Sequence, residues 1–291
     1  MTRPYSTLEL MAVVIARDLQ DGDVLMVGAA MPMVEAAVRL AQLMHGPNMD
    51  LVFPPVRMNL AHLKRIPMPE FHGDRRPMRW AESFWDNGHR FDRLKHWGNH
   101  VFFIGGIQVD RYGNTNLIGI GTDHQRLRFR GPGSVGTPTI SSHVGRYYIV
   151  LNSHSQRVLV ERCDYVSTFG WGEGGSDARA RLGLPGGGPK LCITPLCVMD
   201  FAEHSKHLRL VSVHPGVVES EARAQTGFDL PRDGPVPATA PPTDDELHVL
   251  RTRADVTGRL RERATAVRTR EGNATGYERD VPTQPQPTDN P

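Results

Sequence analysis

An apolar run that ends in two glycines and continues into amide and carboxylate side chains is the segment best suited to chemistry. The run VFFI (residues 101–104) predicts a strand, and Gly105 and Gly106 end it. Residues suited to turns and ligand contacts then follow in close order: Gln108, Asp110, Gly113, Asn114 and Asn116. A strand that stops at a glycine puts such groups at the rim of a sheet, where open α/β sheets bind their ligands.

Three further glycine-rich segments could bring backbone groups close to a ligand. GEGG (172–175) and GGG (186–188) match no phosphate-binding loop, because neither ends in Gly-Lys-Ser/Thr nor lies between a strand and a helix. We interpret them as parts of an exposed loop over 172–189. GPGSVG (131–136) differs, since it follows the strand-like, arginine-rich RLRFR (126–130).

Histidine and cysteine spacing predicts neither a metal site nor a thiol framework. Among the 13 histidines, the closest pairs lack a third ligand nearby, and we expect no metal. Ser153-His154-Ser155 resembles a nucleophile beside a base, but neighbours on a strand point to opposite faces. Cys163, Cys192 and Cys197 are too few for a disulfide framework. They indicate reduced, buried thiols and a cytoplasmic protein.

Composition and charge exclude several classes of protein. The 291 residues, 39% of them hydrophobic, allow a sizeable core. With 34 basic and 32 acidic residues the net charge is +2, which gives no field that argues for nucleic acid. Apolar residues over 8–19 recur at helical spacing and are interrupted by Arg17 and Asp18. This pattern predicts an amphipathic first helix and neither a signal peptide nor a membrane span.

The rest of the chain alternates strands and helices. Residues 23–27, 33–44 and 49–53 predict strand, helix and strand, the unit that builds parallel sheets. Further strands are predicted over 101–104, 147–150, 158–160, 191–201 and 208–214. We therefore predict an α/β domain over 1–230, with an open, mostly parallel sheet and helices on both faces. A Pro-rich linker (231–242), a capped helix (243–267) and a disordered tail (268–291) follow it.

Three segments, in this order, resemble the β subunit of the family I CoA-transferases, and within it the glutaconate CoA-transferase type. They are VFFIGGIQVDRYGNTN (101–116), GPG (131–133) and LRLVSVHPGVVESEARAQTGFDL (208–230). The resemblance implies the open α/β fold of those subunits, a coenzyme A thioester as substrate with no permanently bound cofactor, and an α-type CoA-transferase subunit as partner. Relatives of this type include a hydrolase that opens a steroid-derived ring as its CoA thioester.

The resemblance also implies roles for individual residues. A thioester carbonyl that gains negative charge needs preorganised donors, and Asn116 would supply an amide and Gly133 a backbone N–H. Gln108, Asn114 and Gly131 would support the substrate. The local arginine cluster adds a separate expectation, that Arg126, Arg128 or Arg130 meets the phosphates of CoA, with Arg130 as the substrate-binding candidate. The alternatives are an ordinary turn for Asn114 and Gly133, and a solvated face for the arginines.

One residue type is missing from the expected place. Enzymes of this family use a β-subunit glutamate after the second strand as nucleophile, which attacks the thioester and ends as a glutamyl-CoA thioester. Counting along MDLVFPPVRMNLAHL (49–63) puts that position near Val56, and the segment contains no glutamate; the nearest are Glu35 and Glu70. Either the covalent transfer mechanism is lost or the carboxylate comes from a partner.

Two interpretations of function stay open. The chain is either the β subunit of a heteromeric transferase or ring-opening hydrolase acting on an acyl-CoA, or a non-catalytic subunit that binds acyl-CoA or stabilises a partner. The missing glutamate favours the hydrolase or the binding subunit over the transferase.

Overall fold

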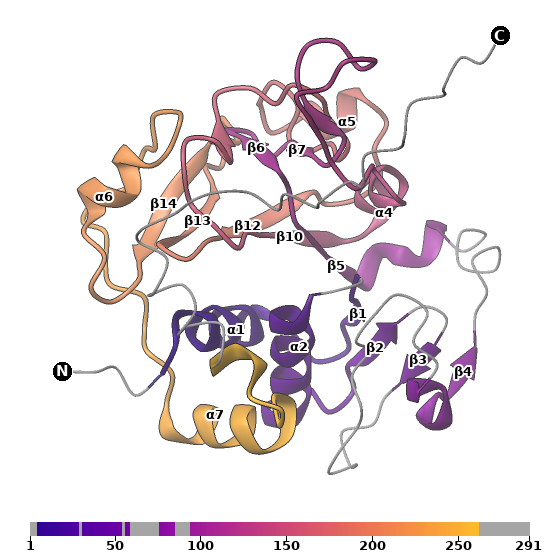
Figure 1. The fold of residues 1–291 in the computed structure, drawn as a ribbon. Helices are drawn as coiled ribbons and strands as arrows, with labels where there is room; N and C mark the ends of the chain where they lie inside the picture. Colours follow the sequence, from indigo (N-terminus) through magenta and orange to yellow (C-terminus); the bar gives the residue numbers. More distant parts are fainter. Residues whose placement is uncertain (1–4, 29–30, 54–55, 59–75, 85–93, 262–291) are drawn as a thin grey trace, which may run out of the picture.

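The computed structural model describes residues 5–28, 31–53, 56–58, 76–84 and 94–261, built around a nine-stranded sheet (Figure 1). The strand order is β14-β13-β12-β10-β5-β1-β2-β3-β4. Strands β2, β1, β5, β10 and β12 are parallel to one another, and an antiparallel pair extends the sheet at each edge. The bounds are β1 Val24–Met26, β2 Asp50–Phe53, β3 Val56–Met58, β4 Ser83–Phe84, β5 His100–Ile104, β10 Arg146–Val150, β12 Pro189–Ile193, β13 Cys197–Phe201 and β14 Leu208–Val213.

Alternating side chains of the central strands divide the interior into two cores. In β5, Val101 and Phe103 belong to one apolar cluster, whereas Phe102 and Ile104 belong to the other. All five residues of β5 are buried, as expected for a parallel strand covered on both faces.

Helices cover the first face. α1 (Thr7–Asp18) begins with a capping box between Ser6 and Glu9, and α2 (Pro32–Met44) packs beside it. The C-terminal elements α7 (Asp244–Val249) and the π-helical turn η3 (Leu250–Ala254) lie against α2 (Figure 1). Within the described residues, none of the helices is long and apolar enough to cross a membrane.

A three-stranded sheet and short helices cover the second face (Figure 1). The small sheet has the order β11-β6-β7, with β6 Gln108–Asp110, β7 Thr115–Asn116 and β11 Leu159–Val160. The remaining elements are β8 Gly119–Ile120, β9 Phe129–Arg130, α4 Thr137–His143, α5 Ala178–Arg181, α6 Glu219–Ala224, η1 Arg76–Trp80 and η2 Leu94–Asn99. The predicted α/β class with a mostly parallel sheet is confirmed.

The segment predicted as a Pro-rich linker lies along the edge strand β14. Leu210 N donates to Pro231 O at 2.8 Å, and Val213 N donates to Pro237 O at 3.1 Å. Thr239 N returns a bond to Val213 O at 2.7 Å. Residues 231–239 therefore cover backbone groups that an edge strand otherwise exposes to association.

Three other predictions differ from the structure in their details. The single strand expected over 191–201 is two strands, because Pro195 lies in the turn between β12 and β13. The capped helix expected over 243–267 starts as predicted with Thr243 as cap, but its α-helical part ends at Val249. The loop expected to be exposed over 172–189 contains α5, in which Arg179 is buried. Residues 262–291, with the predicted tail, lie outside the described part of the chain.

Candidate functional site

The β6–β7 hairpin places the amide and carboxylate side chains of the central motif on one face. Gln108 pairs with Asn116 and Val109 with Thr115 across the two strands. Val109 belongs to the apolar core, so by alternation Gln108, Asp110 and Asn116 lie on the opposite face. Gly113 closes the hairpin at φ +71°, where an added Cβ would meet the Phe201 ring at 2.7 Å. Only glycine allows this turn to pack so closely on the large sheet.

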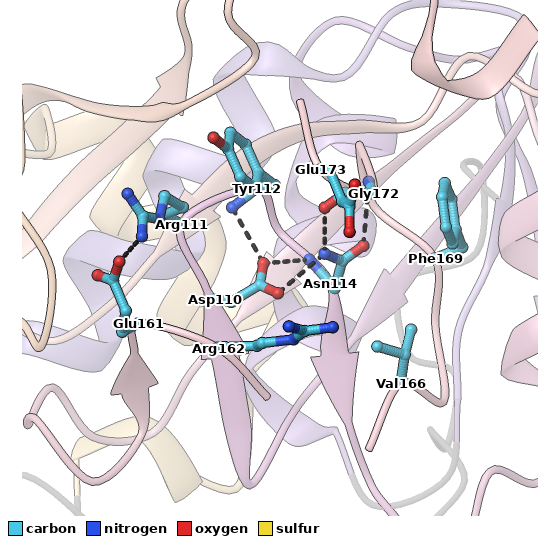
Figure 2. A pocket seen from close by; sticks show the side chains of 10 residues that line it. All are labelled: Asp110, Arg111, Tyr112, Asn114, Glu161, Arg162, Val166, Phe169, Gly172 and Glu173. Carbon is cyan, nitrogen blue, oxygen red and sulfur yellow. Dashed lines mark hydrogen bonds and ion pairs between the residues drawn. The ribbon is translucent and has the colours of Figure 1, made fainter. Parts of the chain in front are cut away.

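Asp110 and Asn114 form a closed polar pair at the tip of the hairpin (Figure 2). Asp110 Oδ2 accepts from Asn114 Nδ2 at 2.8 Å, and Oδ1 accepts from the backbone N–H groups of Tyr112 and Asn114 at 3.0 and 3.1 Å. Burial raises the pKa of the Asp110 carboxyl, and the bonds from Asn114 and the backbone oppose that rise. Asp110 therefore acts as a structural acceptor whose three donors offset much of its desolvation.

Asn114 also holds the segment that faces the hairpin. Its Oδ1 accepts from Gly170 N at 2.9 Å and from Gly172 N at 3.2 Å, while Nδ2 donates to Gly172 O at 2.8 Å. The Cys163 thiol donates to Asn114 O at 3.3 Å. Asn114 is thus an organising residue with four hydrogen bonds to three residues, beyond those expected of a simple turn.

Both residues of this pair line a pocket of about 520 Å³, whose lining side chains are drawn in Figure 2. Its lining combines the polar floor with aromatic, apolar and charged side chains: Asp110, Arg111, Tyr112, Asn114, Glu161, Arg162, Val166, Phe169, Gly172 and Glu173. Arg111 forms an ion pair with Glu161 at one side. Val166 is an exposed apolar side chain and the Arg162 guanidinium extends across the pocket. The volume suits a small molecule or part of one.

Asn116 organises a second turn beside the pocket. Its Nδ2 donates to Gln108 Oε1 and to Gly119 O, both at 2.7 Å, and its Oδ1 accepts from Ile118 N at 2.8 Å and Gly119 N at 3.2 Å. Asn116 is fully buried. Neither amide hydrogen is free in this conformation, so its predicted donation to a thioester stays a prediction that requires one of these bonds to open.

The glycine-rich turn at 131–136 is joined to the Asn116 turn. Gly131 N donates to Ile118 O at 2.8 Å and Gly133 N to Leu117 O at 2.9 Å. An added Cβ on Gly131 would lie 2.2 Å from Leu117 O, so only glycine fits, whereas the space around Gly133 (φ +90°) is open. The N–H predicted to meet the thioester is therefore engaged within the chain, and the role of Gly133 stays a prediction.

Val135, in the same turn, has the left-handed backbone that β-branched residues avoid. Its φ is +54°, and its side chain is 85% exposed, so no packing explains the conformation. Neither Val135 N nor Gly136 N donates to another described residue. Arg130, the last residue of β9, is exposed next to this turn, together with Arg126 and Arg128.

The structure brings most of the predicted residues together. Gln108, Asn116, Gly131 and Gly133 form one hydrogen-bonded group, and Asn114 lies on the adjoining pocket. The sequence did not single out the buried Arg179 or the pocket wall at 166–173, because both lie in glycine-rich connections without periodicity. Among the described residues, no cluster of three or more His, Cys, Asp or Glu side chains could hold a metal ion, and the three cysteines are free and buried.

The region of the expected nucleophile is described only in part. Val56 begins β3 and pairs with Phe53 of β2 and Phe84 of β4. Residues 54–55 and 59–63 lie outside the described residues, as does Glu70. Glu35 lies on α2, buried, where its Oε2 accepts from Arg259 Nη2 at 2.9 Å.

Comparison with known proteins gives consistent matches. The family described as coenzyme A transferase matches residues 70–220. The B subunit of the 3-oxoadipate CoA-transferase of Pseudomonas knackmussii is 35% identical over 256 residues, which cover 85% of this chain and 92% of that protein. The cholesterol ring-cleaving hydrolase IpdB subunit of Mycobacterium tuberculosis is 32% identical and covers 85% and 94%. The crystal structure of glutaconate coenzyme A-transferase from Acidaminococcus fermentans matches with a TM-score of 0.78 and 27% identity over 88% of this chain and 97% of that one.

Proposed function

This chain belongs to the coenzyme A transferase family, and we propose that it is the β-type subunit of a heteromeric enzyme that acts on an acyl-CoA thioester. The observation that carries the proposal is the 35% identity with the 3-oxoadipate CoA-transferase chain over 85% of this chain and 92% of that protein. The hydrogen-bonded group around Asn116 and Gly131 supports the proposal, because these bonds hold a turn in a defined conformation at the edge of the small sheet. The partner is an α-type subunit, as the names of the relatives indicate for those proteins.

Within that family, the sequence favours hydrolysis over transfer. Residues 49–63 contain no glutamate, and the valine near the expected position cannot form an acyl anhydride. Glu35 cannot replace it without breaking its bond to Arg259 on the helical face. The catalytic carboxylate then comes from the partner, and the substrate class includes β-keto or enol acyl-CoA thioesters. Within this class, a steroid-derived CoA thioester is our more specific candidate for the substrate, supported by the 32% identity with the ring-cleaving hydrolase subunit.

The oxyanion donors come from the turn at 131–136. Because Gly133 N is engaged with Leu117 O, the amides of Val135 and Gly136 are the better placed donors. Successive N–H groups around a left-handed residue form a concavity that suits an anion. Asn116 holds this turn in place through Gly119, and the exposed Arg130 next to it meets CoA phosphates.

A second candidate is a non-catalytic subunit that binds acyl-CoA or only stabilises its partner. The observation that favours it is the internal engagement of both predicted donors, Asn116 and Gly133. The two candidates differ in whether this chain contributes to turnover or only to binding.

Co-expression with an α-type subunit encoded next to it tests the proposal. We expect a stable complex that releases CoA from an acyl-CoA thioester, with no turnover by either subunit alone. An α-type subunit with full activity in the absence of this chain would support the non-catalytic candidate. A monodisperse monomer of this chain with full activity would contradict the proposal.

A further inference from the structure

Arg179 is a buried cation without a carboxylate partner among the described residues. Its side chain is 3% exposed, and its guanidinium donates only to backbone carbonyls. Burial lowers the pKa of this guanidinium, with no opposing carboxylate. Taking a charge out of water without a counter-charge is costly, so its carbonyl contacts must offset a large desolvation.

The four carbonyls belong to three separate segments. Arg179 Nη2 donates to Ser141 O of α4 at 2.8 Å, and Nε donates to Gly186 O at 2.9 Å. Nη1 donates to Phe169 O at 3.0 Å and to Gly170 O at 3.2 Å. A planar guanidinium with five fixed donors can join three segments in this way, whereas the three donors of an ammonium group can replace only part of these bonds.

One of these segments is the pocket wall, which is held from its other side as well. Gly170 O accepts from Arg179, and Gly170 N donates to Asn114 Oδ1 at 2.9 Å. Tyr147 OH also donates to Phe169 O at 3.0 Å. The wall is therefore fixed between the buried arginine and the Asp110–Asn114 pair.

A second segment, α4, follows directly on the glycine-rich turn at 131–136. The GGG run explains how the arginine reaches it: Gly186 N donates to Ser142 O at 2.8 Å and Gly187 N to Val144 O at 3.1 Å. An added Cβ would meet Val144 O at 2.5 Å on Gly186 and Gly145 O at 2.0 Å on Gly187. On Gly188 (φ +85°) it would meet Arg179 Cδ at 2.8 Å. Close backbone packing requires glycine at 186 and 187, and the positive φ favours glycine at 188.

We propose that Arg179 is a positioning residue that fixes the pocket wall at 169–172 and the helix after the glycine-rich turn in one geometry. The expected effect on turnover rests on the proposed function. The expected effect on the geometry of the two segments does not depend on it. When the pocket wall and the glycine-rich turn contact the same acyl-CoA, a small displacement of one relative to the other lowers the rate of turnover. The same displacement has little effect on the stability of the helices α1 and α2 on the first face of the sheet.

Arg179→Met in the co-expressed complex tests the proposal, because methionine fills the space and donates no hydrogen bond. Hydrogen exchange at 169–172 and at 141–145 should accelerate about tenfold or more, as expected when bonds from a charged donor are lost. Exchange in α1 and α2 should not change. We expect kcat to fall about 10- to 100-fold while the complex still assembles. Arg179→Lys should restore part of both quantities.

Arg181→Met is the matched control on the same short helix, since Arg181 is exposed and pairs with Asp177. It should leave exchange and kcat near the wild-type values. Unchanged exchange at either segment in the Arg179→Met complex, or a kcat within about threefold of wild type, would overturn the proposal. If Arg179→Met does not fold, Arg179→Lys decides by the same two readouts. A wild-type complex without acyl-CoA turnover would refute the proposed function, and the exchange data would still decide the positioning role.

Discussion

The Asn114 amide donates a hydrogen bond of 2.8 Å from Nδ2 to Oδ2 of the Asp110 carboxylate, and both residues line the pocket. Both hydrogens of the Asn114 amide are used and its oxygen accepts two bonds, because the side chain also bonds to the backbone of Gly170 and Gly172. The pair therefore connects the hairpin motif to the pocket wall and makes the wall sensitive to changes in the hairpin.

Replacing Asn114 with Ala should destabilise the fold. It leaves Asp110 Oδ2 and the backbone N–H groups of Gly170 and Gly172 without their partner, and we expect a loss of at least about 2 kcal/mol in the free energy of unfolding. Denaturant unfolding measures this. Asn152→Ala, at an exposed asparagine, is the control and should change it little. Equal stability of the two variants would show that the Asn114 contacts contribute nothing net.

Asn116→Ala should lower turnover about 100-fold, because it releases the backbone of Ile118 and Gly119 and displaces the turn at 131–136 that carries the proposed oxyanion donors. The affinity for free CoA should barely change, because this turn acts on the acyl carbonyl. Asn116→Asp should be at least as harmful, since a carboxylate there repels Gly119 O, Gln108 Oε1 and a developing oxyanion. Turnover of both folded variants within about threefold of wild type would remove Asn116 from the mechanism.

Acid should destabilise the protein through His154. Burial lowers the pKa of this imidazole to about 4 from 6.5, the usual value. Nε2 lies 3.0 Å from Ala222 O and Nδ1 lies 2.8 Å from Thr194 Oγ1, a hydroxyl that already accepts from Leu196 N and Cys197 N. A second ring hydrogen therefore has no good acceptor.

Because the folded state binds this proton less well than the unfolded state, stability is retained above pH 6.5 and falls as the pH is lowered toward 4. The full shift corresponds to about 3 kcal/mol. Unfolding free energies measured across this range should show a flatter slope for His154→Gln and an unchanged slope for the exposed-site control His124→Gln. Parallel slopes for all three proteins would refute the assignment.

The C-terminal segment should contribute strongly to stability up to the end of its described part. Glu246 accepts two bonds of 2.7 Å from Arg17, Leu250 and Leu260 are buried in the helical core, and residues 231–239 cover β14. Truncation after Leu230 should cost about 1.5–3 kcal/mol for each of the two leucines alone. Truncation after Val267 should move the melting temperature by less than about 2 °C. A larger shift in the second variant would show that the tail packs on the protein.

Sequence patterns predicted the helices and strands that have strong periodicity. They did not predict the contacts between loops that are distant in the sequence. The amphipathic first helix and the β1–α2–β2 unit follow from local residue types, and they are found as expected. Gln108 and Asn116 were predicted within one short polar motif, but their pairing across a hairpin is a finding of the structure. The burial of Arg179 depends on three segments that only the tertiary fold brings together, and a polar residue in a glycine-rich stretch carries no local signal of that role.

The course of the Pro-rich segment was missed for a similar reason. Its composition is that of a linker. It becomes ordered because its backbone bonds to the edge of strand β14, which otherwise has no neighbouring strand on that side. Conversely, the short-range motif located the Asn116 turn but could not show that Gly119 and Gln108 already use both of its amide hydrogens.

Following the acyl group in the co-purified complex tests most directly whether the enzyme hydrolyses the thioester without a glutamate nucleophile from this chain. Thiol release from an acyl-CoA is measured with and without acetate or succinate as acceptor, and borohydride-treated protein is then analysed by peptide mass. Because residues 49–63 hold no glutamate, we predict CoA release that does not depend on the acceptor and no modified glutamate in this chain. Acceptor-dependent transfer of CoA together with a reduced adduct on a glutamate of this chain would contradict it.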